Sequence, residues 1–221
     1  MKNNIIKTTL AFTVLVLLLV TGCKKEDQYP SKTVKVTYPA INLKGDQVVI
    51  LHTGDSYSDA GATLVDDITG ASSDIEAIDN PVDPSTPGVY MVTFTAKNAN
   101  GFETVKQRPV VVTDIDDSWD LTGVYARTAN GVEVNVTKIG RGVYIIDNVG
   151  GVAASSPQFI FPVYMAQLDD ATIEVPAQYI DDGTVLDCVD ETLTAQPGDT
   201  SFSYIVDNPS FGTSTRTFVK Q

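Results

Sequence analysis

Short apolar runs that alternate with turn residues dominate the chain. Runs rich in Val, Ile, Thr, Tyr and Phe recur along residues 34–113 and 119–221, and Gly, Pro or Asn separate them. Such evenly punctuated runs are typical of short antiparallel strands. No long stretch shows the 3.6-residue apolar repeat of an amphipathic helix. The sequence therefore predicts an all-β fold.

The first block, residues 34–113, contains one particularly clear strand. The strands expected in this block are 34–37, 48–51, 62–65, 75–78, 89–97 and 104–112. Within 89–97 successive side chains point to opposite faces, and we expect the even-numbered residues from Tyr90 to Ala96 to face the core. The turn signal at 98–101 joins this strand to the next as a hairpin. Pro109 cannot donate a backbone hydrogen bond, which predicts a free strand edge or a bulge at that position.

Three segments of this block carry a family resemblance. Residues 54–62, 82–90 and 98–101 resemble, in order and spacing, the repeat pattern of bacterial immunoglobulin-like domains found in cell-surface proteins. The resemblance implies an immunoglobulin-like β-sandwich over residues 34–113, whose usual work is display, spacing or adhesion. It implies no catalytic activity. The family usually has Asp where this chain has Asn98.

The second block, residues 119–221, is again β-rich. The strands expected in this block are 121–127, 132–138, 143–147, 159–165, 172–175, 185–189, 202–206 and 215–219. Turn signals at 130–131 and 140–142 make its opening a meander of hairpins. The pattern fits either an antiparallel β-barrel or a second β-sandwich. The acidic residues 114–118 separate the two blocks, and we place a linker there.

The amino end has the features of an export signal. Lys2 and Lys7 precede an apolar run at 10–20, and the small residues Thr21 and Gly22 follow it. A membrane-spanning helix needs about 20 apolar residues, and this run is shorter. Residues 1–22 are therefore expected to be a signal peptide that is removed.

Cys23 follows this segment directly. A Cys after an aliphatic-small-Gly triplet resembles the lipobox of bacterial lipoproteins, which implies cleavage after Gly22 and acylation of Cys23. Two or three acyl chains hold a protein durably on a bilayer. We therefore expect residues 23–33 to be a lipidated tether and the membrane to be a partner through Cys23. The alternative is a secretory signal with an incidental Cys.

The charged residues 24–28 resemble the Lys-plus-acidic signal that sends lipoproteins of Bacteroidetes to the outer face of the outer membrane. The resemblance implies a lipid-anchored protein of the outer membrane that faces the cell exterior. The alternative is that these residues are only a solvated tether.

Composition excludes several classes of partner and framework. The net charge of the chain is −13, and a phosphate backbone would repel such a surface, so no nucleic acid is expected. If Cys23 is acylated, Cys188 has no partner for a disulfide and is expected to be a small buried strand residue.

Residue types that carry catalysis are scarce. His52 is the single histidine, and no phosphate-cradling loop, nucleophile elbow or zinc-protease motif is present. We therefore expect no catalytic residue, no cofactor and no metal. Acidic pairs at 169–170, 181–182 and 190–191 leave a carboxylate-based glycosidase as an alternative, with solvated turn residues preferred. The loop carboxylates of Asp59, Asp66, Asp67 and Asp83 leave a calcium site as an alternative, with solvated loop residues again preferred.

Aromatic residues of the second block are the candidates for ligand binding. Trp119, Tyr179 and Phe211 stand at the junction or in turn-rich contexts, where a ring face can stack on a sugar. We therefore predict a non-catalytic surface lipoprotein whose distal β domain binds an extracellular glycan or an outer-membrane protein. The alternative is a scaffold of an outer-membrane assembly.

Overall fold

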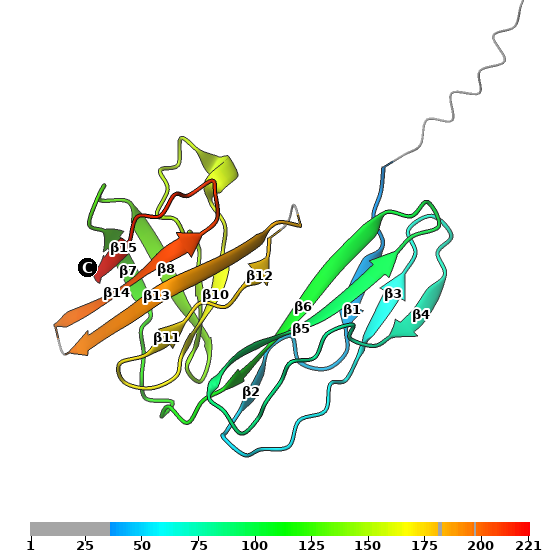
Figure 1. The fold of residues 1–221 in the computed structure, drawn as a ribbon, viewed down its shortest axis with the longest axis horizontal. Coiled ribbons are helices and arrows are strands. Elements are labelled where there is room, and N and C mark those ends of the chain that lie inside the picture. The colour runs from blue at the N-terminus through cyan, green and yellow to red at the C-terminus, as the bar shows by residue number, and fades with distance from the viewer. Residues whose placement is uncertain (1–35, 181–182, 197) are drawn as a thin grey trace, which may run out of the picture. The chain divides into compact units, whose positions relative to one another are not determined.

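The computed structural model describes residues 36–180, 183–196 and 198–221. This part of the chain contains strands and one short 3₁₀ helix, η1 (Pro157–Phe159), so the predicted all-β fold is confirmed (Figure 1). Within the described ranges no helix is long and apolar enough to cross a membrane. The expected signal peptide, the tether and Cys23 lie outside the described residues.

The first block folds into two three-stranded sheets, as an immunoglobulin-like sandwich requires. One sheet has the order β1-β3-β4, and the other has the order β2-β6-β5 with β2 parallel to β6. Their strands are β1 (Ala40–Leu43), β2 (Val49–Leu51), β3 (Ala62–Val65), β4 (Ser72–Ile75), β5 (Gly88–Lys97) and β6 (Glu103–Val112). The predicted hairpin is the β5–β6 pair, which is in register along its whole length.

The core of this sandwich is the face of β5 that the sequence indicates. Val92 and Phe94 are fully buried, Ala96 is buried, and Tyr90 packs against the same cluster while remaining partly exposed. Pro109 lies one residue before Val110, where the pairing of β6 with β2 begins. On that side β6 therefore has no ladder partner at Pro109, and the missing donor costs no ladder hydrogen bond.

Two strand predictions in this block are wrong. Residues 36 and 37 are not in a strand, and the first strand is β1, which begins directly after Pro39. The expected strand 75–78 lies three residues too late, because β4 ends at Ile75. Beyond it, Asp79 forms an isolated bridge with Thr93 of β5.

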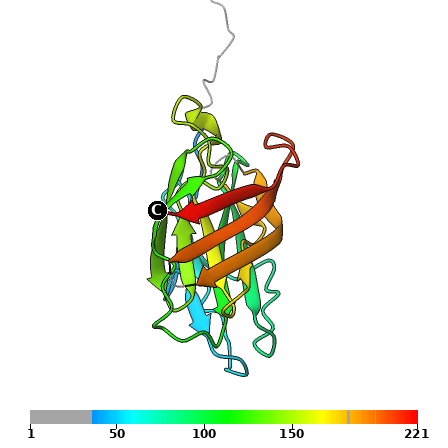
Figure 2. The ribbon, with the colours of Figure 1, turned by 90° about the vertical axis from the view of Figure 1, so that its left-hand side faces the viewer.

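The second block forms one antiparallel sheet of nine strands, in the order β11-β10-β9-β8-β7-β15-β14-β13-β12. Its strands are β7 (Gly123–Arg127), β8 (Glu133–Gly140), β9 (Val143–Ile146), β10 (Val163–Gln167), β11 (Ile173–Glu174), β12 (Gln178–Tyr179), β13 (Val185–Gln196), β14 (Asp199–Asp207) and β15 (Arg216–Lys220). Figure 2 views it with β13, β14 and β15 toward the reader. A second β-sandwich would need two facing sheets. The single curled sheet therefore favours the barrel-like alternative.

Gln178 connects the two ends of the curled sheet. The backbone N–H of Tyr164 in β10 donates to Oε1 of Gln178 over 2.9 Å, and Nε2 of Gln178 donates to the Tyr164 carbonyl over 3.2 Å. The side-chain amide thus replaces the peptide group of a missing strand. Because Gln178 is buried, these bonds satisfy backbone groups that would otherwise be costly to leave unpaired. We call this closure between β10–β11 and β12–β13 the seam.

The interior of the curled sheet is an aromatic cluster. The ring centroid of Phe202 lies 4.9 Å from that of Tyr125 and 5.1 Å from that of Phe218. The buried hydroxyl of Tyr125 donates to the Leu121 carbonyl, and that of Tyr204 donates to the Val149 carbonyl. The interior therefore buries large rings without leaving these hydroxyl groups unpaired.

A third apolar cluster contains residues of both blocks. Val111 of β6 is buried with Val143 of β9 and Ala166 of β10, and partly buried apolar residues of β2 and β5 pack against them. The guanidinium of Arg141 donates to the carbonyls of Leu51, Thr113 and Ile115. The two blocks are therefore joined by a shared apolar cluster and by hydrogen bonds of Arg141. The boundaries 34–113, 114–118 and 119–221 stay a prediction.

Candidate functional site

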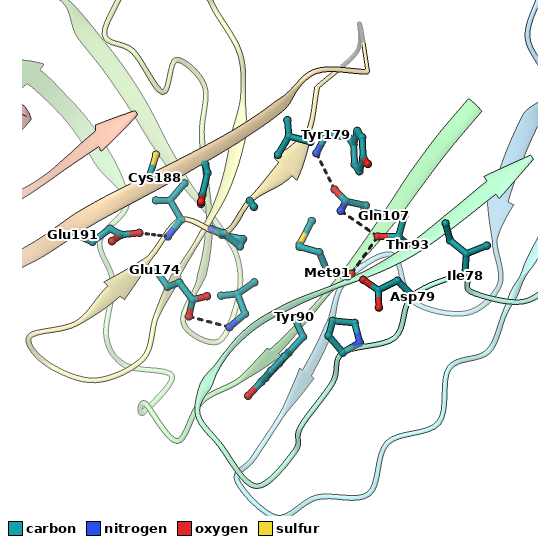
Figure 3. Close-up of a pocket in the computed structure, with 17 residues that line it drawn as sticks. Ile78, Asp79, Tyr90, Met91, Thr93, Gln107, Glu174, Tyr179, Cys188 and Glu191 are labelled. Carbon is teal, nitrogen blue, oxygen red and sulfur yellow. Dashed lines mark hydrogen bonds between the residues drawn. The ribbon is translucent and has the colours of Figure 1, made fainter. Parts of the chain in front are cut away.

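The clearest candidate site is a groove of about 710 Å³ between β5 and the seam (Figure 3). We call it the seam groove. A second groove, also of about 710 Å³, adjoins it and shares Met91, Gln107 and Tyr179 with it. Strand alternation explains part of this placement, because the face of β5 that turns away from the sandwich core carries Met91 and Thr93.

Tyr179, one of the predicted binding residues, lies where the two grooves meet. It is 41% exposed. Its backbone N–H donates to Oε1 of Gln107 over 2.8 Å, and Nε2 of Gln107 in turn donates to Oγ1 of Thr93 over 3.3 Å (Figure 3). These bonds fix the backbone of β12 against β6 while the ring remains open to solvent.

Carboxylates line the opposite wall of the seam groove. Glu174 accepts a hydrogen bond from the Val89 N–H over 3.0 Å, and Glu191 accepts one from the Val175 N–H over 3.4 Å (Figure 3). Asp187 and Asp79 also line the groove, and none of its described lining residues is Lys, Arg or His. The groove is therefore acidic.

A backbone irregularity accompanies Glu191. The register of β13 shifts between Val189 and Thr192, and Asp190 has a φ of 56°, the single positive φ of a non-glycine residue within the described ranges. A bulge of this kind re-aims the next side chain. After the bulge, the side chain of Glu191 lines the groove, while the neighbouring Asp190 is exposed.

Burial in the groove raises the pKa of three carboxyl groups, those of Glu174, Asp187 and Glu191. The neighbouring charges of Glu191 and Asp187 raise the pKa of Glu174 further. Burial also raises the pKa of the Cys188 thiol far above its ordinary value. Cys188 is buried, as predicted, and lacks the thiolate character that reactivity requires.

The other two predicted binding residues, Trp119 and Phe211, do not line the seam groove or the second groove. Trp119 is half-buried, and its carbonyl accepts a hydrogen bond from Nζ of Lys138. Phe211 is half-buried at the end of the curled sheet, where Arg216 lies 5.4 Å from its ring centroid and Phe159 packs edge-on. The structure therefore does not bring Trp119, Tyr179 and Phe211 together.

The loop carboxylates considered for calcium bond to separate partners. Asp59 pairs with Arg108, Asp66 accepts backbone N–H bonds from Ile68 and Thr69, and Asp83 bonds to Ser85 and Thr86. Within the described ranges no group of three or more His, Cys, Asp or Glu residues has an arrangement that would hold a metal ion. The acidic pair at 181–182 lies outside the described residues.

Sequence reasoning did not single out Gln107, Glu174 or Met91. Gln107 and Met91 lie on the outer face of the β5–β6 hairpin, where a polar or partly exposed side chain is ordinary. Glu174 does carry a signal, because it interrupts the apolar pair Ile173 and Val175. That signal identifies an unusual carboxylate but not its partners.

Comparison with known proteins identifies the first block. Residues 41–112 match the family model described as bacterial surface protein, Ig-like domain. The match covers the two facing sheets, so this part of the chain is an immunoglobulin-like domain of the bacterial surface type, as the sequence resemblance implies. It supports a cell-surface or membrane-associated location for the chain.

No curated protein matches the chain. Among solved structures, the crystal structure of a lipoprotein from Bacteroides thetaiotaomicron is similar at 24% identity, covering 83% of this chain and 100% of that chain. Its TM-score is 0.38, and we base no argument on this likeness.

Proposed function

We propose that this protein is a non-catalytic lipoprotein, anchored to the outer membrane through Cys23 and facing the cell exterior. Its immunoglobulin-like domain serves as a spacer, and its curled β domain takes part in binding an extracellular glycan or a protein partner. The bacterial surface Ig-like match supports the surface location, and the residues before Cys23 support the anchor. The observation that carries the binding role is the seam groove with its exposed Tyr179.

The anchor is tested with Cys23→Ser. We expect loss of acylation and movement of the protein from the membrane fraction to soluble fractions, because acyl chains provide the attachment. Protease shaving of intact cells then tests the orientation, since a surface protein is cleaved and a periplasmic one survives. A Cys188→Ser variant should stay in the membrane fraction and serves as the matched control. Equal membrane retention of the Cys23 variant would refute the anchor.

A carboxylate-based glycosidase is the second candidate, because the seam groove contains Glu174, Asp187 and Glu191. Against it, Glu174 and Glu191 each accept a backbone N–H bond, which is a structural task. The measurement is the release of reducing ends from polysaccharides by the purified chain. We expect none; release that Glu191→Gln abolishes would replace the binding proposal with an enzymatic one.

A further inference from the structure

We infer that the seam groove binds a glycan without anionic groups, with a sugar ring stacked on Tyr179 and its hydroxyls donating to the groove carboxylates. This inference rests on the proposed binding function and names the ligand class. Of the three predicted aromatic residues, only Tyr179 contacts the sugar. Trp119 and Phe211 lie outside the site.

The first argument is that several hydrogen-bond donors of the groove already have acceptors within the protein. The N–H groups of Val89, Val175 and Tyr179 donate to Glu174, Glu191 and Gln107. Nε2 of Gln107 donates to Thr93, and the hydroxyl of Tyr90 donates to the Thr86 carbonyl.

Acceptors, by contrast, remain in excess. The carboxylate of Asp79 has no hydrogen-bond or ion-pair partner in the part of the chain that the structure describes, and Asp187 forms no ion pair there. A ligand for this lining must therefore supply donors. Sugar hydroxyls do so, and a hydrogen bond to an ionised carboxylate is stronger than one between neutral groups.

The second argument is the surface on which a ring can lie. Tyr179 presents a ring that is 41% exposed, and the exposed side chains of Ile78 and Val185 line the same groove. The C–H face of a sugar packs on such a surface as other apolar groups do. Because the Gln107 bond holds the backbone of Tyr179, little ordering of β12 is needed on binding.

The third argument is charge. Four carboxylates, those of Asp79, Glu174, Asp187 and Glu191, line the groove, and no basic residue is among its described lining. Uronic acids and sulfated sugars would place like charges beside them, which opposes binding. A neutral glycan avoids this cost, and its binding should change little with salt.

The experiment uses the full chain in detergent micelles and an array of neutral, uronate-bearing and sulfated oligosaccharides, read at low and high salt. We expect binding to neutral glycans at both salt concentrations and none to the anionic ones. Tyr179→Ala should weaken the binding about tenfold, whereas Tyr179→Phe retains the ring and most of the affinity. Asp79→Ala should also weaken it, because the variant lacks an acceptor.

Ile68→Ala is the control, because Ile68 is similarly exposed at 44% and lines neither groove. It should bind as the wild type does. Far-UV circular dichroism of each variant separates loss of binding from loss of fold. Equal binding by Tyr179→Ala and wild type would overturn the inference.

A second probe tests the competing ligand. If the array is silent and polylysine binds in a manner that salt weakens, the groove takes a cationic segment and the glycan inference falls. The proposed function then stands, since a protein partner remains compatible with it. Failure of the Cys23→Ser test would instead refute the anchor and leave the groove assignment untouched.

Discussion

Arg108 is a buried charge that connects the two sheets of the immunoglobulin-like domain. Its guanidinium lies 2.6 Å from Oδ2 of Asp59 and also donates to the carbonyls of Lys44 and Gly61. The side chains of Arg108 and Asp59 are 1% and 9% exposed. Removing one partner of a buried pair leaves the other charge uncompensated, which destabilises strongly.

We therefore expect Asp59→Asn to lower the free energy of unfolding by about 3 kcal/mol, measured by urea denaturation. Asp74→Asn is the matched control, because the Asp74–Lys44 pair is exposed and such pairs contribute little. Equal effects of the two variants would show that the Arg108 pair does not hold the sandwich together.

The contacts of Asn98 explain why this chain has Asn at a position where the family usually has Asp. Its buried amide donates to the Thr37 carbonyl and to Oδ1 of Asp67, while its Oδ1 accepts the N–H groups of Asn100 and Phe102. A carboxylate has no donor for Thr37 and would face the charge of Asp67. The sequence showed the substitution but not these partners, because Thr37 and Asp67 are distant along the chain.

The carboxyl group of Glu174 gives a pH-dependent prediction. Burial and the charges of Glu191 and Asp187 raise its pKa in the folded state. The folded chain therefore retains this proton to higher pH than the unfolded chain, and the ionised group costs stability above its folded pKa. Glu174→Gln removes the charge and keeps an acceptor for the Val89 N–H.

Glu174→Gln should thus raise Tm at neutral pH by about 2 °C. The gain should vanish below the unfolded pKa of about 4.3, where both states hold the proton. Differential scanning calorimetry at the two pH values is the measurement, with the exposed Glu76→Gln as control. A gain of the same size at both pH values would contradict a role for ionisation.

Among the elements, β12 is the one that local patterns do not predict. It contains only Gln178 and Tyr179, and two residues show no alternation. The strand predicted at 185–189 is also too short, because β13 continues to Gln196. The bulge at Asp190 breaks the alternation that would have indicated the continuation. By contrast, β3, β5 and β6 were predictable, since their apolar residues and turn signals agree with their burial.

The seam that β12 completes depends on one side chain. Gln178→Ala removes both bonds to Tyr164 and leaves a backbone N–H and carbonyl without these partners. We expect a loss of roughly 1–3 kcal/mol and faster amide hydrogen exchange at Tyr164. Gln196→Ala, at an exposed position of β13, is the control. Unchanged exchange at Tyr164 would mean that the closure does not depend on the amide.

At the scale of the whole molecule, the candidate site could be anticipated only in part. Tyr179 could be predicted from the sequence, because an aromatic residue in a turn-rich segment is often exposed. Its partners come from β6, β11 and β13, which are far apart in the sequence, and only the curling of the sheet brings Glu174 and Glu191 together beside β5. Periodicity specifies which face of a strand is buried, but not which strands meet at a seam.

The last prediction concerns the two blocks expressed separately. Residues 34–113 and 119–221 each have an apolar cluster of their own, so each piece should melt cooperatively. Separation exposes the shared cluster of Val111, Val143 and Ala166 and removes the bonds of Arg141 to Leu51 and Thr113. Burial of an aliphatic side chain contributes about 1.5–3 kcal/mol, so both pieces should melt below the intact chain.

Calorimetry of the intact chain, the two pieces and their mixture tests this expectation. Arg141→Ala in the intact chain should move its melting toward that of the pieces, while Arg127→Ala, which disrupts contacts inside the curled sheet, should destabilise the second piece itself. If a piece fails to fold alone, the two blocks depend on their shared core and the domain boundary at 114–118 is refuted. If the pieces melt at the temperature of the intact chain, the shared cluster contributes no stability and the groove beside it is held only by the seam.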